Sequence, residues 1–153
     1  MFDDQYESVY EGTELYLVPK LTNETFVPRG TTALLDSIGK TVNSVGARLA
    51  NTPESERPSK VMVVIITDGH ENSSKEFTAA QIKEMTEHQT NVYSWQFLYI
   101  GANQDSFSVA RSYGIGHAFN FSADSKGTGD MYASLGNATA LYRSMGTMDL
   151  GKV

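Results

Sequence analysis

The pattern of apolar and polar positions changes several times along the chain, and each change predicts a different structural element. Residues 61–66 are apolar without interruption, which is typical of a parallel strand that is covered on both faces. Between residues 34 and 49, apolar side chains recur at steps of three and four, as they do on one face of a helix. In full, the pattern predicts strands at 6–10, 15–18, 61–66, 92–100 and 118–121, and helices over 34–49, from 79 onward, over 104–113 and over 130–145.

Further signals mark where these helices begin and end. Thr31 or Thr32 is suited to cap the first helix, because a threonine hydroxyl can accept a hydrogen bond from a free backbone amide. Thr78 and Gln81 match a capping box at the start of the second helix. Gly114 stands just past the expected end of the third helix, where a glycine often terminates the last turn.

Strands and helices alternate from residue 33 onward, and this alternation predicts an α/β fold. We expect a doubly wound, mostly parallel sheet with helices on both faces. The two N-terminal strands, joined by the short connection 11–13, predict a β-hairpin at the edge of the sheet, and residues 126–129 predict a glycine-rich turn. Residues 1–145 are expected to form a single domain, followed by a loose C-terminal tail at 146–153.

The composition limits the kinds of partner and compartment. The chain has 153 residues and a formal net charge of -6, and its 12 Lys and Arg residues are scattered, which argues against a nucleic-acid surface. Because there are no cysteines, disulfides and thiolate metal sites are excluded. No stretch approaches the roughly 20 apolar residues of a membrane span, and the first residues lack the features of a signal peptide. We therefore expect a cytoplasmic protein that binds neither nucleic acid nor membranes.

The apolar strand at 61–66 leads into a polar loop that contains the main candidate site. Asp68 lies at the carboxyl end of this strand, where ligands of α/β sheets gather, and Gly69 lets the backbone turn sharply or approach a ligand. The alternative is that Asp68 serves only the turn. His70 and Glu71 could join Asp68 in a metal or acid-base cluster, although a histidine in a polar loop is typically just exposed. Motifs of hydrolases, zinc proteases and P-loop enzymes are lacking, so we do not expect an enzyme.

Four segments of the chain resemble a known family. They are residues 2–4 (Phe-Asp-Asp), 28–39 (Pro-Arg-Gly-Thr-Thr-Ala-Leu-Leu-Asp-Ser-Ile-Gly), 64–69 (Val-Ile-Ile-Thr-Asp-Gly) and 99–105 (Tyr-Ile-Gly-Ala-Asn-Gln-Asp). In this order they resemble von Willebrand factor type A (vWA) domains, in particular the intracellular subgroup of bacteria and phages. The resemblance implies a vWA-type, Rossmann-like sheet over nearly the whole chain.

The resemblance also implies a metal site. vWA domains hold Mg²⁺ in a metal-ion-dependent adhesion site, which combines an Asp-x-Ser-x-Ser loop, a threonine before a helix and an aspartate after a strand. The threonine corresponds to Thr32 and the aspartate to Asp68, but no Asp-x-Ser-x-Ser segment precedes Thr32. A partial site of one neutral and one anionic oxygen would bind Mg²⁺ weakly in this chain alone. The implied ligand rim around it comprises Thr31, Gly69, His70 and Glu71.

The missing loop follows the first strand of the family, so the resemblance implies an N-terminally truncated domain. That strand normally lies in the middle of the sheet, and its loss would leave strand edges that recruit other strands. We expect a fragment or a late-start product that self-associates or is complemented by the missing segment. The alternative is that the remaining strands close up.

Two functions remain open. The first is a protein-binding module of the vWA type, whose rim around the partial metal site engages an acidic residue of a protein partner. The alternative is a metal-independent scaffold or assembly protein that uses sheet-edge or oligomeric contacts. Metal dependence of binding distinguishes the two.

Overall fold

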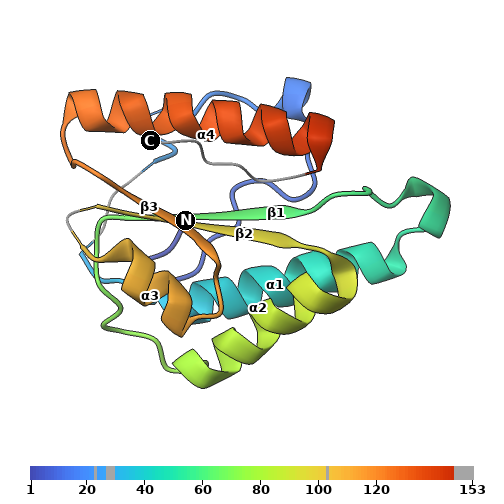
Figure 1. Ribbon diagram of the computed structural model, residues 1–153, viewed down its shortest axis with the longest axis horizontal. Coiled ribbons are helices and arrows are strands. Elements are labelled where there is room, and N and C mark those ends of the chain that lie inside the picture. Colours follow the sequence, from blue (N-terminus) through green and yellow to red (C-terminus); the bar gives the residue numbers. More distant parts are fainter. Residues whose placement is uncertain (23, 27–29, 103, 147–153) are drawn as a thin grey trace.

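The computed structural model describes residues 1–22, 24–26, 30–102 and 104–146. Three parallel strands form the sheet, in the order β1-β2-β3. The elements are β1 (Met62–Thr67), β2 (Gln96–Ala102), β3 (His117–Phe121), α1 (Leu34–Asn51), α2 (Ala79–Tyr93), α3 (Ser106–Ser112), α4 (Ser125–Met145) and the short 3-10 helices η1 (Leu15–Leu17) and η2 (Glu54–Glu56). Helices α1, α2 and α3 lie on one face of the sheet and α4 lies on the other (Figure 1). The predicted α/β class and parallel strands are confirmed.

The strand order is compatible with a Rossmann-like fold but does not show a doubly wound sheet. In a doubly wound sheet the order of strands reverses at a switch point. Here β1, β2 and β3 follow one another in one direction across the described sheet. Of the expected C-terminal tail, Gly146 ends α4 in a left-handed conformation (φ 74°), and residues 147–153 lie outside the described residues.

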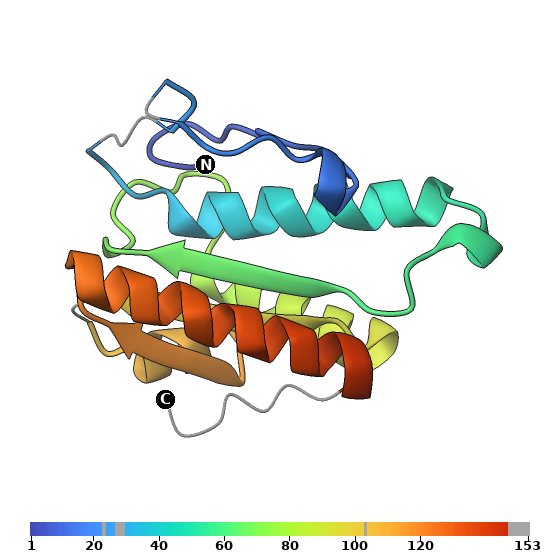
Figure 2. The ribbon, with the colours of Figure 1, turned by 90° about the horizontal axis from the view of Figure 1, so that it is seen from above.

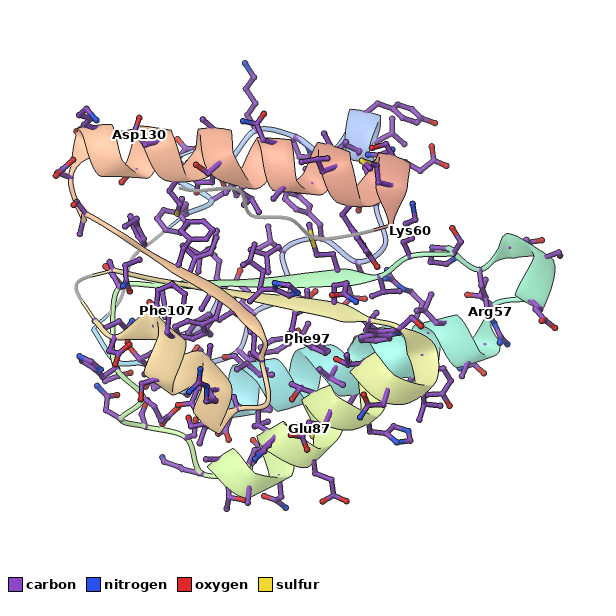
Figure 3. All side chains as sticks on the ribbon, in the orientation of Figure 1. Arg57, Lys60, Glu87, Phe97, Phe107 and Asp130 are labelled. Carbon is purple, nitrogen blue, oxygen red and sulfur yellow. The ribbon has the colours of Figure 1, made fainter. Side chains whose placement is uncertain are left out.

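The core lies on both faces of the central strand β2. Phe97 and Tyr99 pack with α1 and α2 residues in one layer, and Leu98 and Ile100 pack against α4 in the other, because successive side chains of a strand point to opposite faces. Figure 3 shows Phe97 between the sheet and the lower helices. Leu98 and Ile100 are fully buried, and burial of such a side chain stabilises the fold by roughly 1.5–3 kcal/mol.

Local signals decide several helix boundaries. The capping box is present, with the Thr78 hydroxyl accepting from the Gln81 amide, so the second predicted helix begins where expected. Helix α4 begins five residues before the predicted start at 130, because the Asp124 carboxylate accepts a hydrogen bond from the Gly127 amide at 2.7 Å. The predicted turn at 126–129 is therefore wrong, and these residues form the first turn of α4.

The predicted N-terminal hairpin is not confirmed. Residues 15–17 form η1, and the one β-bridge described in this segment pairs Phe2 with Tyr6. Just before this segment, the buried Asp3 turns the chain, because its carboxylate accepts from the Gln5 amide at 2.6 Å and its carbonyl accepts from the Ala33 amide at 2.6 Å. A short polar side chain that bonds its own backbone turns the chain and competes with a strand ladder.

None of the helices in the described part of the chain has the length and apolar content needed to cross a membrane.

Strand β1 is an edge strand of the described sheet, and its polar backbone groups divide into two sets. The Gln96 amide donates to the Val61 carbonyl at 2.9 Å, and Met62 pairs with Gln96. In a parallel ladder this places the amides of Val63, Ile65 and Thr67 toward β2, because alternate residues bond to opposite sides. The amides and carbonyls of Met62, Val64 and Ile66 therefore face the open edge.

This division predicts an alternating pattern of hydrogen exchange along β1. The amides of Met62, Val64 and Ile66 should exchange with deuterium much faster than those of Val63, Ile65 and Thr67, because only the second set is bonded in the ladder. Residue-resolved exchange measured by NMR tests the pattern. Uniform protection along β1 would show that its outer edge is covered.

Candidate functional site

The candidate site begins where β1 ends. The Thr67 hydroxyl stabilises the turn that follows the strand. It accepts a hydrogen bond from the Gly69 amide at 3.2 Å and donates one to the Gly69 carbonyl at 3.1 Å. Asp68 is exposed, and its carboxylate makes no hydrogen bond or ion pair with another described residue. The turn therefore does not need Asp68, and the carboxylate is available to a ligand.

Thr32 lies beside this turn although it is far away in the sequence. Its amide donates to Asn72 Oδ1 at 2.9 Å, and its carbonyl accepts from the Asn72 amide at 3.1 Å. A Cβ added at Gly69 would lie only 2.5 Å from Thr32 Oγ1, so the absence of a side chain at Gly69 allows this approach. Thr31, Thr32 and Asp68 line the same cavity. The structure thus brings Thr32 and the Asp68 turn together at the carboxyl end of β1.

Glu71 does not face a ligand, because its carboxylate caps α1. Oε2 accepts from the Leu35 amide at 2.9 Å and from the Ser74 hydroxyl at 2.7 Å, and Oε1 accepts from the amides of Ser73 and Ser74 at 3.0 and 2.8 Å. Burial raises the pKa of Glu71, but these hydrogen bonds outweigh burial and hold the pKa below its ordinary value. Of the predicted rim, Thr31 and His70 are exposed and Gly69 is half-buried.

The predicted N-cap of α1 is wrong. The N-cap residue is Ala33, which makes no side-chain cap, so neither Thr31 nor Thr32 caps this helix. The free amides of the first turn are bonded instead by the loop between β1 and α2, through Glu71 and through the Ser74 hydroxyl, which accepts from the Asp36 amide at 3.1 Å.

The carboxylate of Asp36, in the first turn of α1, binds amides of the loop after β1. The sequence did not predict this connection. Asp36 is 7% exposed and accepts hydrogen bonds from three consecutive loop amides, those of Lys75, Glu76 and Phe77, at 2.8, 2.9 and 2.9 Å. Burial raises the pKa of Asp36, but these amides lower it below the ordinary value. The available signal was an acidic residue in the first turn of a helix, which is a common feature and names no partner.

The donor set at the rim does not fit a tight Mg²⁺ site. Mg²⁺ requires about six oxygen ligands in an octahedron, usually with at least one or two carboxylates or phosphates. Thr32 offers a hydroxyl and Asp68 a carboxylate, while Glu71 is occupied by backbone amides. Within residues 1–22, 24–26, 30–102 and 104–146, no group of three or more His, Asp or Glu side chains is arranged to hold a metal ion.

A cavity of about 630 Å³ extends from the rim along β1. It lies between the strand and the N-terminal segment, which runs beyond the β1 edge of the sheet (Figure 2). The volume is within the range of ligand-binding clefts, roughly 300–1,000 Å³. The lining residues are Met1–Asp3, Tyr6–Tyr10, Phe26, Thr31, Thr32, Ser37, Ile38, Thr41 and Val63–Asp68.

The role of Glu71 can be tested by replacing it with glutamine. Glu71→Gln leaves donors of the loop or of α1 without an acceptor, so we expect a loss of about 1–3 kcal/mol in the free energy of unfolding at neutral pH. Because the folded pKa is lowered, the stabilisation by wild-type Glu71 is present above the unfolded pKa and is lost as pH falls through the folded pKa. The difference in the free energy of unfolding between the wild type and Glu71→Gln should therefore become smaller as the pH is lowered.

Denaturant unfolding at a series of pH values measures this gap. Glu84→Gln is the matched control, since Glu84 is an exposed residue of α2, and it should change stability by no more than about 0.5 kcal/mol. Equal stability of Glu71→Gln and the control would contradict a capping role.

The metal fit gives a separate prediction. Calorimetric titration with Mg²⁺ or Mn²⁺ should show a dissociation constant of about 1 mM or weaker, because one carboxylate and one hydroxyl compete poorly with water. Tight, stoichiometric uptake that disappears in Asp68→Ala would overturn this expectation.

Comparisons of the chain with models of protein families, with curated proteins and with solved structures found no match. The vWA resemblance therefore stays a prediction that rests on the four segments of the sequence.

Proposed function

We propose that the chain is a protein-binding module and that its ligand rim is the carboxyl end of β1. The observation that carries the proposal is the exposed Asp68 carboxylate, which lines the same cavity as Thr32. This pair agrees with the vWA resemblance, in which the same two positions lie at the binding rim. Thr31 and His70 extend the rim as exposed polar side chains.

Binding is favoured over catalysis by the way the acidic groups are used. A general acid-base pair needs two titratable groups within reach of the same reacting atom. Glu71 and Asp36 are occupied by backbone amides of the loop and of α1, so they serve the fold. Asp68 and His70 are exposed, and neither forms a hydrogen bond with another described titratable group.

The charge of the rim specifies the partner group. Because Asp68 is acidic and the donor set fits Mg²⁺ poorly, an acidic side chain of a partner would be disfavoured at this rim. A lysine, an arginine or a neutral hydrogen-bond donor would be attracted. We therefore favour the metal-independent form of protein binding, and engagement of an acidic residue through Mg²⁺ is the competing form.

Site-specific crosslinking tests the proposal. A photoreactive amino acid at His70 should crosslink a protein partner in an extract of the source cells, and the same amino acid at Glu84 should not, because only the first position lies on the rim. Addition of Asp68→Ala to the His70 probe should weaken the adduct. Identical adducts from both positions, or none from His70, would contradict a binding rim.

The partner recovered in this way then decides between the two forms of binding. Its affinity for the protein, measured by calorimetry, should be the same in Mg²⁺ and in a chelator. Loss of affinity in the chelator would establish the metal-dependent form.

A further inference from the structure

The outer edge of β1 has backbone groups that nothing in the described chain uses. The amides and carbonyls of Met62, Val64 and Ile66 face away from β2, and no hydrogen bond from another described residue reaches them. Unpaired groups of this kind form a ready template for another strand.

The cavity lies along the same edge. Its walls are the β1 residues Val63–Thr67 on one side and the N-terminal residues Met1–Asp3 and Tyr6–Tyr10 on the other. Val63, Val64, Ile66 and Phe2 are only partly buried, so apolar surface remains exposed inside it. An extended segment placed next to β1 would satisfy the edge groups and cover this surface, with its side chains alternating between the two faces.

The charges around the cavity indicate which segment fits. Its charged side chains are the carboxylates of Asp3, Glu7 and Asp68, and the described lining contains no Lys or Arg. The α-ammonium of Met1 also lines the cavity and donates to the Glu7 carbonyl at 2.7 Å, and Asp3 and Glu7 each interact with other groups of the chain, so Asp68 is the carboxylate that can select a partner charge. A second copy of this chain carries a net charge of -6, which disfavours it next to the Asp68 carboxylate. A segment with a cationic side chain near Asp68 is complementary instead.

We propose that the cavity beside β1 binds an extended segment of a partner protein as an added strand, with alternating apolar residues and a Lys or Arg next to Asp68. The inference rests on the proposed protein-binding function and names the partner chemistry at that site. Main-chain hydrogen bonds to Met62, Val64 and Ile66 supply the pairing, and Asp68 selects the charge at the end of the segment.

A synthetic peptide as long as β1 tests the proposal. It alternates valine with threonine and carries arginine at one end, and a second version carries the arginine at the other end, so that both strand directions are covered. Binding of one version should slow hydrogen exchange at the amides of Met62, Val64 and Ile66 and leave Val63, Ile65 and Thr67 unchanged. Absence of protection at the first three amides with both peptides would overturn the proposal.

Two matched peptides separate strand addition from nonspecific contact. N-methylation of the residues whose amides face β1 should weaken binding by more than roughly tenfold, because these amides donate to the edge carbonyls. N-methylation of the other alternate residues should have little effect. Equal effects of the two methylation patterns would contradict strand addition.

Variants of the protein give an independent reading. Val64→Pro removes an amide that faces the open edge, and it leaves the hydrogen bonds to β2 intact. It should therefore abolish peptide binding, whereas Val64→Thr keeps the amide and should retain binding.

The variant Asp68→Asn tests the choice of charge. The preference for the arginine peptide over a glutamate version, roughly fivefold in the wild type, should disappear in this variant. Retention of that preference would contradict the assigned role of Asp68.

The tests distinguish failure of strand addition from failure of the proposed protein-binding rim. Crosslinking of a partner at His70 together with no peptide protection along β1 would reject strand addition and leave the binding rim in place. Concentration-dependent dimerisation that protects the same three amides would show that a second copy is the occupant and would reject the cationic segment.

Discussion

The exchange of hydrogen bonds between the start of α1 and the loop after β1 is the constraint on which the rest of the site depends. Glu71 bonds an amide in the first turn of α1, and Asp36 in that turn bonds three amides of the loop. Each carboxylate thus satisfies donors that the other segment cannot satisfy itself. Two segments separated by more than thirty residues are fixed to each other, and the positions of Thr32 and Gly69 follow from this connection.

This connection separates the two acidic residues of the loop into one that serves the fold and one that stays exposed. Glu71 is held by several donors and is half-buried, so a ligand would have to break the cap of α1 to reach it. Asp68 is three residues earlier and has no such partners among the described residues. A sequence motif that contains both residues therefore combines one structural carboxylate with one that can meet a partner.

Much of the fold could be predicted from the sequence because its signals are local. The apolar run of β1 and the capping box of α2 each depend on neighbouring residues, and both are confirmed. The pairing of Asp36 with the loop could not be predicted, since the sequence does not show which distant amides a carboxylate will meet. The N-terminal hairpin was predicted from a local strand pattern and is not confirmed, since residues 15–17 form η1 instead.

For the site, the resemblance places Thr32 and Asp68 at one rim, and it does not give the roles of the neighbouring residues. The approach of Thr32 to the Asp68 turn agrees with the position that the resemblance gives them, whereas the capping role of Glu71 required coordinates. The open edge of β1 could not be predicted either, because an apolar run indicates that both faces of a strand are covered but does not show which strands lie beside it. In this sheet the faces of β1 are packed by helices while one edge borders a cavity with acidic side chains. Carboxylates beside an unpaired edge disfavour pairing with an identical acidic chain, and the same charges attract a cationic strand.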